Sequence, residues 1–319
     1  MIFEKQVVNG YKGMMFSRCD DTESVFYFSA ADFPGLMCEE FSFASSLGHT
    51  LFGYFYAYDG FDDKRLIVFD HGFGGGHRAY MREIEKLARH GYRVLAYDHT
   101  GCMESGGASP NGLAQSLVDL NDCIAAVKAD ARFSGIDISV VGHSWGAFST
   151  MNVTALHPEI SHIVAMCGYV SVEDMINTLF PGLLRGYRHA VLALERAANP
   201  EFSSFNAARS LAASNTRALL IYSADDTLCR PVHYEILSKA LAGRDNVKLL
   251  LVNGKGHNPN YTRNAVRLLS EFGRARARLL KRKGVTSDDR ARFVASFDWH
   301  AITEQDEEIW EKIFLHLDS

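Results

Sequence analysis

Short apolar runs alternate with longer amphipathic stretches from about residue 50 to residue 255, and this alternation strongly constrains the fold. Most runs are continuously apolar, as expected for strands buried on both faces of a parallel sheet. The stretches between them have helical periodicity, as in Tyr80–Arg89 and Leu113–Ala129. The pattern predicts an α/β protein with a mostly parallel central sheet flanked by helices. The predicted strands are Leu51–Tyr58, Leu66–Phe69, Arg93–Tyr97, Ile138–Val141, His162–Met166, Ala218–Tyr222 and Lys248–Val252.

The 319 residues are predicted to form a single domain, residues 1–319, with an insertion. No internal repeat and no linker rich in proline, glycine and serine divides the chain. Between two predicted strands, however, about fifty residues depart from the alternation. They contain the helix-breaking pairs Pro181-Gly182 and Asn199-Pro200. We therefore expect residues 168–215 to form a helical cap.

The two ends of the chain also depart from the alternation. In residues 1–48, alternating side chains in Val25–Phe28 and Glu40–Ala44 suggest antiparallel strands at the sheet edge. Residues 284–319 are predicted to form a C-terminal extension with a terminal helix that starts at a capping sequence, Thr303–Asp306. One stripe of this helix is apolar and should pack on the core; it comprises Ile309, Trp310, Ile313, Phe314 and Leu317.

Composition excludes several classes of protein. The net charge of −5 argues against a dedicated nucleic-acid-binding protein, and a basic run from Arg274 to Lys283 is best interpreted as a solvated helix face rather than an anionic-surface contact. No apolar run approaches the roughly 18 residues of a membrane-spanning helix. The first residues do not form a secretory signal, so we expect a cytoplasmic protein. The six widely spaced cysteines predict reduced thiols and no metal.

The sequence Gly142-His143-Ser144-Trp145-Gly146 follows a predicted strand and precedes a helical stretch. A Gly-x-Ser-x-Gly pattern arises readily by chance, so this strand–turn–helix context carries the prediction. On such a turn the serine hydroxyl is raised above the sheet, and side chains in place of the flanking glycines would clash. Because serine is a weak nucleophile without assistance, a base must lie within hydrogen-bond reach.

A carboxylate and a histidine follow in the second half of the chain. The predicted strand Ala218–Tyr222 runs into a loop that contains Asp225 and Asp226, and after the next strand comes His257 between Gly256 and Asn258. A carboxylate at such a position can orient the imidazole and stabilise its protonated form. Spacing alone leaves both aspartates as candidates.

With these residues the chain resembles the α/β-hydrolase fold superfamily over most of residues 48–272. The order of serine, acid and base is that of the superfamily. The loop from Ser223 to Cys229 is similar to the acid loop of the family, and its register implies Asp226 rather than Asp225. The resemblance therefore implies a triad of Ser144, His257 and Asp226, with no cofactor.

A glycine-rich segment, His71–Gly76, is similar to the oxyanion loop of the same superfamily. Acyl transfer places negative charge on an oxygen, which backbone N–H groups must stabilise. The resemblance implies that these donors are Phe73 and Trp145. The turn Asp98–Ser105 is also similar to a family turn, although Met103 replaces its second glycine.

The predicted function is that of a serine hydrolase which cleaves a carboxylic ester of a small-molecule acyl substrate through an acyl-enzyme. The chain resembles the capped branch that includes carboxylesterases, monoacylglycerol lipases and serine aminopeptidases, so thioesterase and aminopeptidase activities remain alternatives. An aminopeptidase would need carboxylates near the pocket to hold an ammonium group. The candidates are Glu173, Asp174, Glu195 and Glu201.

Two further alternatives belong to other classes. A non-catalytic protein of this fold would bind an apolar ligand under the cap, and a lyase or acyltransferase would use the same serine differently. Apolar residues of the cap, such as Leu179 and Leu183, either pack in the core or face a substrate. His77 and Tyr80 are candidates for the mouth of the site. The sequence does not indicate the oligomeric state.

Overall fold

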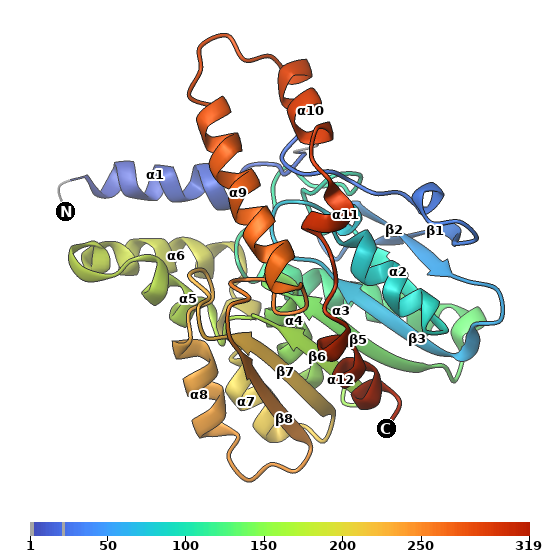
Figure 1. Cartoon of the computed structure of the whole chain (residues 1–319). Coiled ribbons are helices and arrows are strands. Elements are labelled where there is room, and N and C mark those ends of the chain that lie inside the picture. Colours follow the sequence, from blue (N-terminus) through green and yellow to red (C-terminus); the bar gives the residue numbers. More distant parts are fainter. Residues whose placement is uncertain (1–2, 21–22) are drawn as a thin grey trace.

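The computed structural model describes residues 3–20 and 23–319. Within these ranges eight strands form one sheet, in the order β1-β2-β4-β3-β5-β6-β7-β8 (Figure 1). β2 is antiparallel to both β1 and β4, and all other neighbours are parallel. The predicted mostly parallel sheet is thus confirmed. The strands are β1 Met37–Ala44, β2 Thr50–Ala57, β3 Asp62–Asp70, β4 Tyr92–Tyr97, β5 Asp137–His143, β6 His162–Met166, β7 Arg217–Ser223 and β8 Val247–Val252.

Helices cover both faces of this sheet. Alternate residues of β3 enter two different cores: Leu66 and Val68 pack with residues of α3, α4 and α8, whereas Ile67 and Phe69 pack with residues of α2, α9 and α12. Burial on both faces explains why the strands are continuously apolar. The α-helices are α1 Glu4–Met15, α2 Met81–Arg89, α3 Gln115–Ala129, α4 Trp145–Asn152, α5 Val172–Leu179, α6 Arg188–Ala198, α7 Ala207–Ala213, α8 Val232–Ala240, α9 Arg263–Leu279, α10 Ser287–Ala295, α11 Trp299–Ile302 and α12 Glu307–Leu317.

The predicted strands correspond to β2 through β8, and Glu40–Ala44 lies in the antiparallel edge strand β1. The strand predicted at Val25–Phe28 is wrong. Phe28 is buried, and Phe26 stacks on Trp299 with ring centroids 6.5 Å apart. This segment therefore packs its aromatic side chains on the C-terminal extension, while β1 occupies the edge of the sheet.

Three helices, α5, α6 and α7, lie between β6 and β7, in the segment predicted as a cap. The chain turns after α5 at Pro181 and Gly182, and α6 ends before Asn199. α7 packs on α4, beside the sheet. α1, which the sequence analysis did not predict, lies alongside α6 (Figure 1). We call α1, α5 and α6 the roof.

The C-terminal extension packs against the face of the sheet opposite to α3 and α4. Its last helix begins one turn later than predicted, because Asp306 is the N-cap and accepts a hydrogen bond from the Ile309 N–H. Thr303 instead donates to the carbonyl oxygen of Trp299. Most of the predicted apolar stripe is buried, and Lys281–Lys283 are exposed. None of the helices in the described ranges is long and apolar enough to cross a membrane.

Candidate active site

Ser144 occupies a strained turn between β5 and α4. Its φ of 57° and ψ of −112° lie outside the regions that most side chains adopt. A Cβ on Gly142 would lie 2.2 Å from Thr150 Oγ1, and a Cβ on Gly146 would lie 2.0 Å from the carbonyl oxygen of Asp70. Both glycines are therefore required for the close approach of the turn, as the motif predicts.

His257 lies between the serine and a buried carboxylate. Its Nε2 is 2.8 Å from Ser144 Oγ, and its Nδ1 is 2.7 Å from Asp226 Oδ2. Asp226 is 3% exposed, and its Oδ1 accepts hydrogen bonds from the backbone N–H groups of Leu228 and Cys229. Since a carboxylate can only accept, Nδ1 carries the proton and Nε2 is free to accept the serine hydroxyl proton.

Asp225, the other candidate acid, holds the loop before His257. Its carboxylate accepts hydrogen bonds from the backbone N–H groups of Gly254, Lys255 and Gly256, at 2.8, 3.2 and 3.1 Å. The two neighbouring aspartates thus have different contacts. Asp226 contacts the imidazole, whereas Asp225 fixes the loop that carries it.

Phe73 and Trp145 lie next to each other, with ring centroids 5.1 Å apart. Trp145 is the first residue of α4, where backbone N–H groups have no partner within the helix. The Trp145 indole N–H donates to the carbonyl oxygen of Leu113 at 2.8 Å, which fixes the ring. The backbone N–H of Trp145, which directly follows Ser144, therefore lies at the positive end of the helix dipole of α4.

Two histidines, His143 and His71, hydrogen-bond to the loops of the site. Burial, followed by the nearby His257, lowers the pKa of His143 to about 3, so its ring is neutral. Its Nε2 therefore donates to the carbonyl oxygen of His257 at 2.7 Å, and its Nδ1 accepts from the Tyr80 hydroxyl at 2.9 Å. His71 is similarly neutral, with a pKa of about 3, and donates from Nδ1 to Gly72 O in the glycine-rich loop.

The expected position of His77 at the mouth of the site is wrong. Its side chain is fully buried, and Nδ1 lies 2.7 Å from Asp98 Oδ1 while Nε2 lies 2.9 Å from the Tyr56 hydroxyl. A ring placed between a carboxylate and a phenol belongs to a buried polar network. Tyr80, in contrast, lines the cavity over Ser144, as expected.

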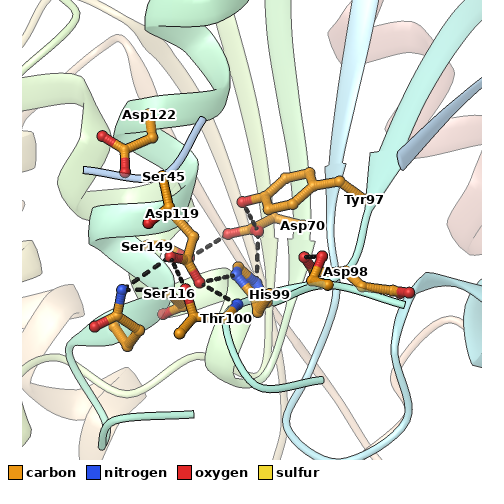
Figure 2. A network of polar contacts seen from close by, with 12 residues as sticks. Ser45, Asp70, Tyr97, Asp98, His99, Thr100, Ser116, Asp119, Asp122 and Ser149 are labelled. Atoms are coloured by element: carbon orange, nitrogen blue, oxygen red, sulfur yellow. Dashed lines mark hydrogen bonds and ion pairs between the residues drawn. The ribbon is translucent and has the colours of Figure 1, made fainter. Parts of the chain in front are cut away.

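A second polar network, the Asp70–His99–Asp119 cluster, lies in the core near the serine turn (Figure 2). His99 forms ion pairs with Asp70 at 2.9 Å and with Asp119 at 3.2 Å, and all three side chains are fully buried. Burial opposes protonation of His99, but the two carboxylates outweigh it and raise its pKa to about 9. Ser149 contacts the carboxylate of Asp70 and donates to the carbonyl oxygen of Gly146. The cluster thereby supports the turn.

A cavity of about 280 Å³ opens over Ser144 and His257. The roof contributes Met14 and Met15 from α1, and Met175 and Leu179 from α5. The contribution of α1 was not predicted, because no motif links residues 3–15 to the serine. The rest of the lining is mainly apolar and includes Phe73, Leu113, Tyr169, Leu228 and Cys229.

Glu195 fastens this roof to the cavity wall. It is fully buried, and its carboxylate accepts hydrogen bonds from the Tyr11 hydroxyl at 2.6 Å and from the Leu113 N–H at 2.7 Å. The carbonyl oxygen of Leu113 accepts from both Trp145 and Tyr169. Burial raises the pKa of Glu195 to about 7, although both hydrogen bonds favour the ionised form.

One group of three potential metal ligands occurs among the described residues: Cys167, Asp226 and His257, whose ligand atoms lie within 4.8 Å of one another. Asp226 and His257 are already hydrogen-bonded to each other. Burial, followed by the negative charge of Asp226, raises the pKa of the Cys167 thiol well above its usual value. Metal binding requires the thiolate, so these three residues are an unfavourable donor set for a metal ion.

Part of the chain is similar in sequence to known α/β hydrolases. A sequence model of the α/β-hydrolase fold matches residues 65–204. Esterase YjfP of Escherichia coli (strain K12) is 29% identical over 127 residues, which make up 37% of this chain and 51% of that protein. An epoxide hydrolase of Caballeronia sordidicola is 29% identical over 93 residues, or 29% of this chain and 27% of that protein. The matches thus span about half or less of these relatives.

Solved structures share the fold over a larger part of the chain. The Pyrococcus furiosus esterase Pf2001 has a TM-score of 0.59 at 20% identity and covers 81% of this chain and 96% of its own. Est1E from Butyrivibrio proteoclasticus, solved with ferulic acid, has a TM-score of 0.54 at 18% identity. The match covers 72% of this chain and 95% of the Est1E chain. The chain therefore has the α/β-hydrolase fold, and esterases are among the proteins to which its sequence and its structure are similar.

Proposed function

We propose that this protein is a serine hydrolase that cleaves carboxylic esters through an acyl-enzyme. The observation that carries the proposal is the bridging position of His257, within 2.8 Å of Ser144 Oγ and 2.7 Å of Asp226 Oδ2. A serine turn, a histidine and a buried carboxylate in this geometry are what nucleophilic catalysis by serine needs.

The reaction proceeds in two halves. Ser144 Oγ attacks the ester carbonyl while His257 Nε2 takes its proton, and the N–H groups of Phe73 and Trp145 stabilise the oxyanion. The tetrahedral intermediate collapses, and His257 returns the proton to the departing alcohol oxygen. Water then attacks the acyl-enzyme with the help of the same base. Asp226 holds the imidazole in the required tautomer throughout. Residues 168–215, together with α1, serve as the cap of this site.

An ester is favoured over an aminoacyl substrate because of where the cap carboxylates lie. Glu195 is buried against Tyr11, Asp174 accepts a hydrogen bond from Ser171, the N-cap of α5, and Glu173 pairs with Arg196 on the surface. Among the described residues that line the cavity, none of the four candidate carboxylates occurs. An ammonium group would therefore lack a counter-ion. Epoxide opening in this superfamily uses a carboxylate on the nucleophile turn, where this chain has Ser144.

The test is intact mass after exposure to a fluorophosphonate ester. In this reaction Ser144 Oγ bonds to phosphorus, fluoride leaves, and His257 accepts the proton. We expect one adduct per chain in the wild type and none in Ser144→Ala, which should also lose roughly 10⁴-fold or more of its esterase activity. Ser134→Ala, on the exposed loop before β5, is the matched control and should label fully.

Two results would contradict the proposal. Labelling that persists in Ser144→Ala would assign the reactive group to another residue. A folded wild type that neither labels nor hydrolyses simple esters would favour a non-catalytic protein that binds an apolar ligand under the cap.

A further inference from the structure

A second cavity, of about 300 Å³, adjoins the one over Ser144, and Phe73 and Tyr80 line both. Its other walls include Ser24–Tyr27, which follow the roof helix in sequence, and Trp299 and Thr303 of the C-terminal extension. Asn258 and Tyr261 close it on the side of the His257 loop. This cavity thus depends on segments at both ends of the chain, outside the central sheet.

The position of this cavity relative to the reacting atoms distinguishes it from the first. The cavity over Ser144 extends beneath the roof, between α1 and α5. The second cavity lies past the glycine-rich loop and is bordered by Asn258, the residue that follows His257. In ester cleavage His257 delivers a proton to the alcohol oxygen, so the alcohol must be directed toward the histidine loop. An ester bound at Ser144 can therefore place its acyl group under the roof and its alcohol in the second cavity.

The lining of the second cavity indicates which alcohols suit it. Six of its residues are aromatic, namely Phe26, Tyr27, Phe73, Tyr80, Tyr261 and Trp299. Aromatic rings pack favourably in offset or edge-to-face contact with other rings. A cavity of about 150 Å³ is large enough for benzene, so about 300 Å³ accommodates one substituted ring.

We propose that the second cavity binds the alcohol portion of the ester and that this alcohol is aromatic, of the benzyl type. The inference rests on the proposed function, since it assigns the leaving-group side of the same reaction. It adds a substrate class: esters of an apolar acid of moderate size with an aromatic alcohol.

Three butanoate esters that share one acyl group test this assignment: benzyl, cyclohexylmethyl and ethyl butanoate. Their alcohols have similar leaving-group acidity, so differences in kcat/KM report binding of the alcohol. Burying one ring should raise kcat/KM for the benzyl ester roughly 10- to 100-fold over the ethyl ester. The cyclohexylmethyl ester is similarly apolar but not planar, and should be hydrolysed more slowly than the benzyl ester.

Two variants fill the second cavity from two different elements. Ala79→Leu fills it from the segment before α2, and Leu269→Trp fills it from α9. Each should lower the ratio of benzyl to ethyl kcat/KM toward one. Met175→Trp, which fills the first cavity, is the matched control. It should change the preference for acyl length, measured with ethyl acetate and ethyl hexanoate, and keep the benzyl preference.

The outcomes separate the two proposals. If the wild type hydrolyses none of the three esters, the proposed function fails. If it hydrolyses the benzyl and ethyl esters with equal kcat/KM, or if the ratio stays at the wild-type value in both filling variants, the second cavity does not hold the alcohol. Equal kcat/KM for the benzyl and cyclohexylmethyl esters would overturn the aromatic preference.

Discussion

Two buried acidic sites lie near Trp145, and their charges are balanced differently. The ring centroid of His99, in the Asp70–His99–Asp119 cluster, lies 4.6 Å from that of Trp145, and Glu195 is joined to Trp145 through Leu113. On the sheet side, Asp70 and Asp119 flank His99, whose pKa of about 9 keeps it protonated at neutral pH. On the roof side, the contacts of Glu195 are a phenol and a backbone N–H. A buried carboxylate that faces a cation remains ionised, whereas one that has only neutral donors is protonated more easily.

These contacts indicate which part of the site is fixed and which part changes its hydrogen bonds with pH. The Asp70–His99–Asp119 cluster lies among strands and α3 and supports the serine turn through Ser149. The Glu195 contact joins three separate pieces, α1, α6 and the segment before α3, with hydrogen bonds that depend on one carboxyl group. We therefore expect the serine turn to be the rigid part of the site and the roof to be the adjustable part.

Removing the buried cation should lower stability more than any other change considered. His99→Asn leaves two carboxylates unpaired in the core and should lower the free energy of unfolding by about 3–5 kcal/mol, measured by urea denaturation at pH 7. His189→Asn, on the exposed surface of the roof, is the matched control and should change it by less than about 0.5 kcal/mol. In a double variant, Asp119→Asn should recover part of the loss caused by His99→Asn. Additive losses would mean that the cluster is not coupled by charge.

The pH dependence of stability distinguishes the Asp70–His99–Asp119 cluster from Glu195. A group whose pKa is raised on folding stabilises the protein below its unfolded pKa, and this stability is lost as pH rises through the folded value. The stabilisation by His99 is lost between about pH 6.5 and about pH 9. The stabilisation by Glu195 is lost between about pH 4.5 and about pH 7. The advantage of wild type over Glu195→Gln should therefore shrink between pH 4.5 and 7, on the order of 2–3 kcal/mol.

The corresponding difference for His99→Asn should shrink at higher pH, between 6.5 and 9. Comparing each variant with wild type at every pH cancels the other groups that titrate, such as the buried Glu83. Glu201→Gln, at an exposed carboxylate between α6 and α7, is the control and should give a flat difference. If Glu195→Gln also gave a flat difference, the carboxyl group would be ionised as freely as in the unfolded chain.

The sequence predicted the serine turn better than the roof, because the two regions differ in how local motifs relate to their contacts. The serine turn and the loops of Asp226 and His257 each follow a strand in the parallel part of the sheet, so the carboxyl edge of that sheet brings them together. The fold was predictable for the same reason. The roof depends on a hydrogen bond between Tyr11 and Glu195, 184 residues apart, and no local pattern records such a contact.

The core cluster was partly visible in the sequence. Asp98–Ser105 was predicted to be a turn, and Met103 adopts a φ of 45°, the conformation that the missing glycine would supply. The charge partner Asp119 lies on α3, whose apolar residues were predicted to face the core. A polar residue on such a face signals a buried network, but the partner can be identified only once the neighbouring strands are placed.

The smallest expected effect concerns the hydroxyl that joins α1 to α6. Tyr11→Phe removes one hydrogen bond to Glu195 and keeps the ring in the core, so it should cost about 0.5–1.5 kcal/mol of stability. Because Met14 and Met15 follow on the same helix and line the cavity, loosening α1 should lower kcat/KM for ethyl hexanoate a few-fold more than for ethyl acetate. Tyr234→Phe on α8 is the matched control and should leave this ratio unchanged. Equal losses for both esters in Tyr11→Phe would mean that the hydroxyl acts on the serine turn through Leu113 and Trp145, and the roof would then be as rigid as the core.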